Sequence, residues 1–326
     1  MTRLAVLSAL AGALVLGACN DLGVTDPNNP ALEDVQENPP PTGVNTAIIA
    51  LLIGARAGIA SQNGYVALLG ILGREGYNFD PADPRFVSEM LIGPLDGGSP
   101  AFGGNLWSAR YANIRNANLV LNAVEKVVGL TNAQKEGIRG FAKTIQALEL
   151  LLVINTRDAN GAAIDVDLPP TAPPAPIVGK AEVFTRIITL LNEAQTHLGA
   201  AGSSFSFPLS GGFTGFNTPS TFLRVNRAIR ARVAIYQGDW STALTALGQS
   251  FLDPAASLEL GAYHTYSTGS GDQTNDLFDP AGRALHGHPS LLADAQLRTN
   301  GTRDLRIQQK VTTGSAVTVQ GITSNL

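Results

Sequence analysis

The sequence has 326 residues, among them 35 glycines and 19 prolines, and its net charge is −4 at pH 7. No basic cluster stands out, which argues against a nucleic-acid partner. A single cysteine excludes an internal disulfide framework and a zinc site built from several thiolates.

The N-terminus predicts export and lipidation. Residues 1–18 have the layout of a bacterial secretory signal: a positive charge at Arg3, a short apolar run and then small residues. The apolar run is shorter than the roughly 20 residues of a membrane-spanning helix. It ends in "LGAC", whose cysteine is Cys19, and this resembles a lipobox. We predict a signal peptide over 1–18 and a lipid anchor on Cys19; the alternative is a free cysteine after an ordinary signal or in an N-terminal membrane helix.

The first third of the mature chain predicts a tether, helices and a long loop. Residues 19–43 are polar and rich in proline, which predicts a flexible tether. Residues 44–72 are apolar and predict one long helix, or two helices joined near Asn63-Gly64. Residues 73–105 carry no clear pattern, and a loop of this length in a compact domain is either functional or disordered.

Three further helices are predicted between residues 106 and 198. In the first, over 106–128, apolar residues recur at helical spacing and predict a buried face. A capping box of Thr131 and Gln134 starts the second, which runs to about Asn155. A proline-rich link over 165–179 precedes the third, over 180–198. The predicted buried face of the first helix consists of Trp107, Tyr111, Ile114, Leu121, Val124 and Val128.

Residues 221–252 predict a tight antiparallel helical hairpin. Gly238 suits the left-handed position after a helix, and Asp239 is a good N-cap for the next one. Alanines on both helices allow close approach, and Trp240 is predicted to lie in the core. Such a unit resembles a tetratricopeptide-type hairpin. The alanines are Ala228, Ala231, Ala234, Ala243 and Ala246. The C-terminal residues alternate and contain β-branched side chains, which predicts one or two strands.

These segments, in this order, resemble the SusD/RagB family of outer-membrane nutrient-binding lipoproteins. The resemblance rests on the lipobox and tether, on "LWSARYANIRNANLVLNAVE", on "IRGFAKTIQALELLLVINTRD" with the following link and helix, and on "NRAIRARVAIYQGDWSTALTAL". It covers roughly residues 15–253. It implies a mostly α fold, SusD-like, with tetratricopeptide-type hairpins, long irregular loops and minor β structure near the C-terminus. One helical ligand-binding domain would span residues 44–326.

The resemblance also implies a role. The chain would be anchored in the outer membrane through its lipid and face the cell surface. It would capture an oligosaccharide or a peptide and deliver it to a TonB-dependent SusC-like transporter. Family members are usually much longer, so we expect this chain to lack the C-terminal portion that often helps to form the ligand surface and the transporter contact.

Candidate ligand-binding residues lie in the long loop, where aromatic rings could stack on sugars and polar groups could bind hydroxyls. They are Tyr77, Asn78, Phe79, Asp80, Arg85, Phe102 and Asn105. The alternative is that these aromatics pin the loop to the helical body. A second rim could be lined by Tyr263, His264 and Tyr266.

Metal and catalytic motifs are weak or missing in the sequence. His286 and His288 lack a placed third ligand for a metal. Asp272, Asp276 and Asp279 lack the compact spacing of an EF-hand calcium loop. We find no nucleophile elbow, no zinc-protease motif and no P-loop. We therefore predict a binding protein without enzymatic activity, metal or cofactor. The alternatives are a periplasm-facing helical scaffold that binds other proteins and a glycosidase.

Overall fold

The computed structural model describes residues 39–96, 102, 104–169, 171–278 and 284–326. The predicted signal peptide, the predicted lipidation site Cys19 and most of the predicted tether lie outside the described residues. The structure begins with a helix at Pro41, so the last three residues of the predicted tether are helical. Proline is favoured in the first turn of a helix, where its missing N–H leaves no bond unmade.

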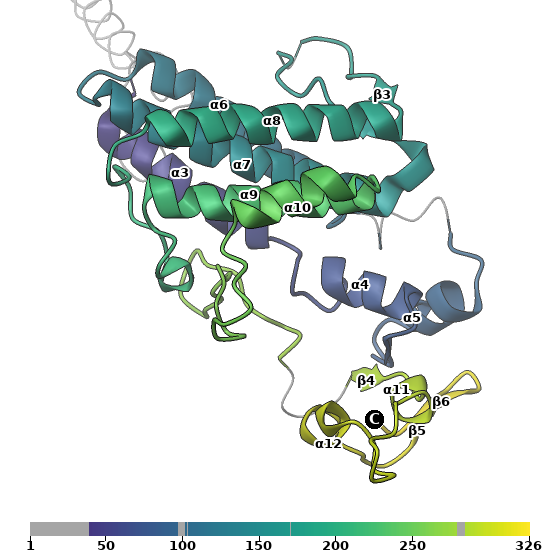
Figure 1. Cartoon of the computed structure of the whole chain (residues 1–326). Coiled ribbons are helices and arrows are strands. Elements are labelled where there is room, and N and C mark those ends of the chain that lie inside the picture. The colour runs from purple at the N-terminus through teal and green to yellow at the C-terminus, as the bar shows by residue number, and fades with distance from the viewer. Residues whose placement is uncertain (1–38, 97–101, 103, 170, 279–283) are drawn as a thin grey trace, which may run out of the picture.

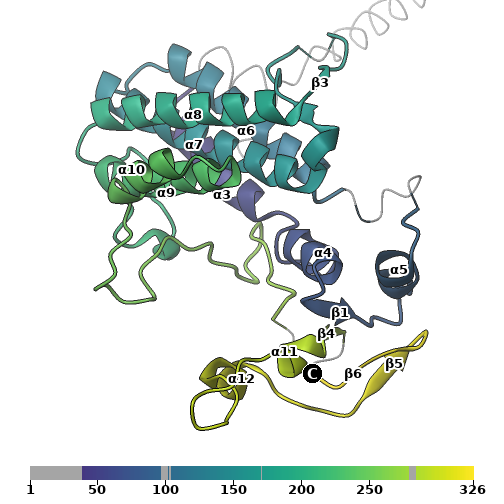
Figure 2. The same ribbon diagram turned by 45° about the vertical axis from the view of Figure 1, so that its right-hand side comes forward.

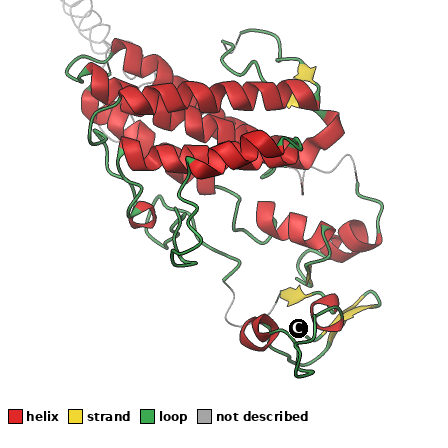
Figure 3. Ribbon diagram, in the orientation of Figure 1, coloured by secondary structure: helices red, strands yellow, loops and turns green. Residues whose placement is uncertain are grey.

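Long helices pack together into one layered unit, the helical body (Figures 1 and 3). Helix α7 lies at its centre, in contact with α3, α6, α8 and α9, and helix α10 packs against α9. This arrangement confirms the prediction of a mostly α fold. The helices of the body are α3 (Pro41–Arg56), α6 (Ser108–Lys126), α7 (Asn132–Arg157), α8 (Lys180–Ala200), α9 (Pro219–Tyr236) and α10 (Trp240–Gly248).

Shorter elements form the rest of the described chain. Figure 2 shows α4, α5 and β1 between the helical body and the C-terminal residues. The strands form three two-stranded antiparallel sheets, β1 with β4, β2 with β3, and β5 with β6. The short helices are α4 (Tyr65–Leu72), α5 (Arg85–Val87), α11 (Ser290–Ala293) and α12 (Leu305–Lys310), with a π-helical turn at Ser88–Ile92 and 3-10 turns at Asp158–Asn160 and Gly211–Phe213. The strands are β1 (Gly76–Asn78), β2 (Ala162–Ala163), β3 (Ile177–Val178), β4 (Leu285–Gly287), β5 (Val317–Val319) and β6 (Ile322–Ser324).

The capping signals in the sequence are confirmed. The Thr131 hydroxyl accepts from the Gln134 N–H at 3.2 Å, and the Gln134 side chain accepts from the Thr131 N–H at 2.9 Å, which starts α7. Gly238 has a φ of +71° between α9 and α10. The Asp239 carboxylate then accepts from the Thr242 N–H at 3.0 Å and caps α10. The hairpin over 221–252 is therefore present as predicted.

Residues 44–72 form two helices, α3 and α4, separated by a turn at residues 57–64, which agrees with the second of the two predicted alternatives. Other boundaries differ from the sequence predictions. Residues 73–105, predicted to be irregular, contain β1, α5 and the π-helical turn. Val128 is 85% exposed because α6 ends at Lys126 and carries it out of the buried face. Trp240, predicted to be in the core, is 65% exposed because it starts α10, a helix that packs against α9 and buries little else than Ala243 and Ala246.

Buried apolar side chains form three clusters. Two lie inside the helical body, one between α3, α6, α7 and α9 and the other between α7, α8 and α9. The third joins α4, β1, α5 and the π-helical turn. Partly buried side chains of β5 and β6 also pack against this third cluster, so it joins the short elements to the C-terminal strands. Among the described residues, no helix combines the length and the apolarity needed to cross a membrane.

A buried polar network joins α6 and α7 inside the helical body. The side chains of Arg110 and Glu149 are fully buried, and Nη1 of Arg110 lies 2.9 Å from Oε2 of Glu149. Asn113 donates to the other carboxylate oxygen at 2.7 Å. Arg110 also donates to the carbonyl oxygens of Ala55, in the last turn of α3, and of Ala57, just past its end. The network therefore fixes the end of α3 to α6 and α7.

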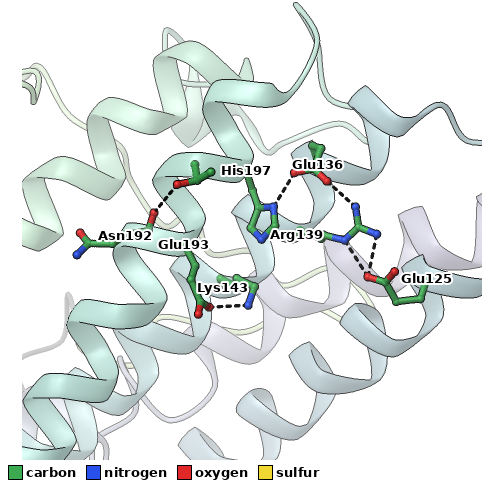
Figure 4. A network of polar contacts seen from close by, with 8 residues as sticks. Glu125, Glu136, Arg139, Lys143, Asn192, Glu193 and His197 are labelled. Atoms are coloured by element: carbon green, nitrogen blue, oxygen red, sulfur yellow. Dashed lines mark hydrogen bonds and ion pairs between the residues drawn. The ribbon is translucent and has the colours of Figure 1, made fainter.

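A second network lies at the surface between α6, α7 and α8 (Figure 4). Arg139 bridges Glu125 and Glu136, and His197 contacts the second of these carboxylates at 2.6 Å. One turn further along α7, Lys143 pairs with Glu193 at 2.7 Å. These pairs are partly exposed, in contrast to the buried pair of Arg110 and Glu149.

Candidate functional site

A cleft of about 780 Å³ opens beside α4 and β1. Three stretches that are distant in the sequence line it: the turn between α3 and α4, the residues after β1, and the residues before β4. Its volume lies within the range of roughly 300 to 1,000 Å³ that is typical of ligand pockets. The lining residues are Ser61, Gln62, Asn63, Asp80, Pro81, Asp83, Phe86, Asp276, Phe278 and Ala284.

Two asparagines of the predicted site brace this cleft from behind. The Asn78 side chain is fully buried and donates to the Gln62 carbonyl oxygen at 3.4 Å. Its Oδ1 accepts from the Asp80 N–H at 2.9 Å. Asn105 donates to the carbonyl oxygen of Asn63 at 3.2 Å. Asn78 and Asn105 thus position the residues of the cleft wall instead of lining it.

Three carboxylates face the cleft. Asp80 accepts from the Ala82 N–H at 2.9 Å, which holds the tight turn after β1. Asp83 pairs with Arg85 at 2.7 Å, and the hydrogen bonds from Arg85 hold the pKa of Asp83 below its ordinary value. Asp276 accepts from the Thr274 hydroxyl at 2.9 Å, and its own N–H donates to the Ala60 carbonyl oxygen at 2.9 Å. The cleft therefore offers several carboxylate hydrogen-bond acceptors from two segments that are distant in the sequence.

An exposed aromatic ring completes the lining. Phe278 is 75% exposed, whereas Phe86, on the opposite stretch, is 4% exposed. Single exposed apolar side chains are common at protein surfaces, so Phe278 is of interest here because it lies in the lining of a cleft together with polar groups. An aromatic face next to carboxylate and amide groups can stack on the apolar face of a sugar while its hydroxyls are hydrogen-bonded.

The other predicted aromatics are packed inside the protein. Tyr77 is 8% exposed and Phe79 is 4% exposed, and their rings stack with centroids 5.4 Å apart. Each also contacts a histidine of the paired strand region: Tyr77 contacts His288 at 5.0 Å, and Phe79 contacts His286 at 5.1 Å. This packing favours the alternative in which these rings pin the loop to the body.

Phe102 and Arg85 lie at the edge of the same loop. The Phe102 ring packs against Phe86 with centroids 5.3 Å apart. The Arg85 guanidinium lies 5.4 Å from the centre of the Phe102 ring. Of the seven predicted residues, Asp80 lines the cleft, and the other six pack or hydrogen-bond behind the lining.

The remaining sequence candidates lie elsewhere. None of Tyr263, His264 and Tyr266 lines the cleft. Asp272 pairs with Arg56, and Asp279 lies outside the described residues. Among the described residues, no group of three or more histidine, cysteine, aspartate or glutamate side chains could hold a metal ion.

Sequence reasoning missed Gln62, Asn63, Asp83 and Phe278 as cleft residues. The polar run "SQNG" at 61–64 did give a signal, because it interrupts an apolar stretch and so predicts a turn. Phe278 gave none, since its place in the cleft depends on a contact that is distant in the sequence, the hydrogen bond from the N–H of Leu277 to the Ala60 carbonyl oxygen.

Several SusD-like proteins are among the solved structures that superpose on part of this chain. A laminarin-binding SusD-like protein superposes with a TM-score of 0.49 at 20% identity, over 63% of this chain and 42% of that one. A SusD superfamily protein from Bacteroides vulgatus gives 0.49 at 12% identity, over 66% and 43%. A SusD-like carbohydrate-binding protein from the same organism gives 0.47 at 18% identity, over 63% and 43%. The chain thus spans less than half the length of these structures. No protein-family model and no curated protein sequence matches it.

Proposed function

We propose that this chain is a SusD-like binding protein that captures an oligosaccharide in the cleft and does no covalent chemistry on it. The observation that carries the proposal is the exposed Phe278 ring beside Asp80, Asp276 and the amide of Asn63. The resemblance of the sequence to the SusD/RagB family supports it. A peptide is the second ligand class that this resemblance implies.

The cellular part of the proposal rests on the sequence. The lipobox supports a lipid anchor on Cys19 in the outer membrane, with the protein facing the cell surface. The captured ligand would pass to a TonB-dependent SusC-like transporter. Affinity purification of the lipidated protein from outer membranes, followed by mass spectrometry, tests this part. Recovery of such a transporter supports the partnership, and its absence from a clean purification contradicts it.

A Phe278→Ala substitution tests the cleft. Loss of one stacking contact of roughly 0.5–1.5 kcal/mol predicts oligosaccharide binding that is weaker by about 2- to 12-fold. Calorimetric titration with a panel of neutral and acidic oligosaccharides measures the change on the ligand that binds best. Trp240→Ala is the matched control, since Trp240 is 65% exposed on α10 and does not line the cleft. Unchanged affinity in Phe278→Ala, with the fold intact, would show that the ligand binds elsewhere.

A scaffold that binds other proteins is the alternative function. It is supported by exposed apolar side chains on α10, where Trp240 is 65% and Leu244 is 72% exposed. Protease treatment of whole cells separates the two proposals. A surface-facing binding protein is cleaved, whereas a periplasm-facing scaffold is protected.

A further inference from the structure

One turn is bonded to every stretch that lines the cleft. Residues 57–64 connect α3 to α4 and contribute three polar residues to the lining. The Ala60 carbonyl oxygen, in this turn, accepts from the N–H of Asp276 at 2.9 Å. The Gln62 carbonyl oxygen accepts from the buried Asn78 side chain at 3.4 Å, at the end of β1. The position of the 57–64 turn therefore sets how the walls of the cleft lie relative to one another.

A buried charge holds the start of this turn. Arg110, on α6, is fully buried and donates to the Ala57 carbonyl oxygen and, at 3.1 Å, to the Ala55 carbonyl oxygen. Its charge is balanced by Glu149 on α7, whose Oε2 lies 2.9 Å from Nη1 of Arg110. The pair therefore connects the 57–64 turn to the centre of the helical body.

The hydrogen bonds around Glu149 are those of its ionised form. Oε2 accepts from Arg110, and Oε1 accepts from Nδ2 of Asn113 at 2.7 Å, so both oxygens face donors. A proton added to the carboxylate needs an acceptor instead. The buried Oδ1 of Asn113 has no hydrogen-bond partner among the described residues, and it can accept this proton once the amide turns over. That rotation breaks the bond from Nδ2 to the Leu51 carbonyl oxygen on α3, so protonation of Glu149 rearranges the contacts of α3.

Burial brings this protonation close to neutral pH. Desolvation raises the pKa of Glu149 to about 7, and the one charged group that acts on it among the described residues is Arg110. Arg56, at the end of α3, is itself paired with Asp272. The other titratable groups that interact with Arg110 are Tyr65, His264 and Tyr266. Burial lowers the pKa of the histidine to about 4 and raises the pKa of both tyrosines, so none of the three changes charge near pH 7.

We propose that Arg110 and Glu149 are positioning residues for the cleft, and that proton uptake by Glu149 weakens ligand binding. This inference rests on the proposed function of the cleft. The ionised pair holds the 57–64 turn where it brings the cleft walls together, and the protonated form rearranges the contacts that fix the end of α3. Because such coupling is reciprocal, a ligand that binds the assembled cleft displaces part of a proton from Glu149.

An NMR titration of the full mature chain tests the positioning role without a ligand. The backbone amide signals of residues 57–64 should shift with a midpoint near pH 7. Glu149→Gln has the shape of the protonated acid and cannot ionise, so it should remove this transition. Glu193→Gln, in the partly exposed pair with Lys143, is the control and should keep it. Absence of the transition in the unmodified protein, or its persistence in Glu149→Gln, would overturn the proposal.

Calorimetric titration with the oligosaccharide that binds best measures the effect on the cleft. From about pH 8 to pH 6, the affinity should fall by about 2- to 12-fold, the change expected for one hydrogen bond. Glu149→Gln should bind at the weaker level at both pH values. A pH dependence that Glu149→Gln retains would overturn the role of Glu149 and point to His286 and His288, which pack on aromatic rings next to the cleft. Failure of every oligosaccharide to bind would contradict the proposed function, whereas the NMR titration would still decide the positioning role.

Discussion

At the scale of residues, the main contrast is between ion pairs that are buried and ion pairs at the surface. Burial raises the pKa of Glu149 to about 7, against the opposing effects of Arg110 and Asn113. This direction shows that desolvation outweighs the attraction of the pair. The ion pair of Arg110 and Glu149 therefore compensates for the burial of its own two charges and adds little to the net stability of the fold.

Removal of one partner should nevertheless be costly. In Glu149→Ala, the guanidinium of Arg110 stays buried without its carboxylate, and we expect the free energy of unfolding to fall by about 3–5 kcal/mol. Urea denaturation at pH 8, above the pKa of Glu149, measures the loss. Glu193→Ala is the matched control, because it breaks the half-exposed pair with Lys143 and should cost at most about 1 kcal/mol. Equal losses in the two variants would show that burial of the Arg110 pair does not increase the cost of breaking it.

At the scale of elements, the contact of α7 with α8 depends on a glycine. A Cβ atom built on Gly140 would lie 2.6 Å from Cγ of Leu198 and 3.0 Å from its backbone nitrogen. Contacts this short cannot be relieved by the Leu198 side chain alone, because one of them is with backbone. The two helices can approach this closely only because position 140 carries no side chain.

We therefore expect Gly140→Ala to destabilise the protein. Overpacking of this kind costs about 1–3 kcal/mol, and the close contact with the Leu198 backbone places the cost toward the upper part of this range, above the gain in helix propensity of about 1 kcal/mol. Thermal unfolding followed by circular dichroism measures the difference. Gly199→Ala, on α8 with nothing near the added Cβ, should leave the midpoint unchanged or slightly higher. A midpoint that rises in both variants would show that the helices have room to separate.

The helices were predictable because their signals are local. Caps at Thr131 and Asp239 and the apolar period of α8 specify where helices begin and which side is buried. Trp240 was not predictable in the same way. Its exposure depends on which helix of the hairpin faces outward, and nothing within residues 221–252 encodes that choice.

At the scale of the whole molecule, stability should be unevenly distributed. Helix α7 is surrounded by other helices, whereas residues 253–278 contain no helix or strand and are mostly exposed. Amide hydrogen exchange should therefore be slowest in the middle of α7 and fastest in 253–278. Mass spectrometry of peptic fragments measures both in one experiment. Comparable protection of the two segments would show that residues 253–278 are held as firmly as the helical body.

The cleft was only partly predictable, because its residues come from segments that are distant in the sequence. The sequence indicates Asp80 through its loop, yet Asp276 and Phe278 join it from the far end of the chain. Three stretches must be brought together before they form a site, and the spacing of residues along one stretch carries no information about the other two.

The pairing of β1 with β4 has a consequence for how the protein matures. It joins residues 76–78 to residues 285–287, and the Phe79 N–H donates to the Ala284 carbonyl oxygen at 2.7 Å beside the cleft. Closing so long a loop is slow compared with forming local helices. During synthesis, the helices of the body can therefore form before residues 284–287 are made, and the two sides of the cleft are joined only afterwards. A nascent chain would therefore acquire most of its buried helical core before the walls of the cleft come together.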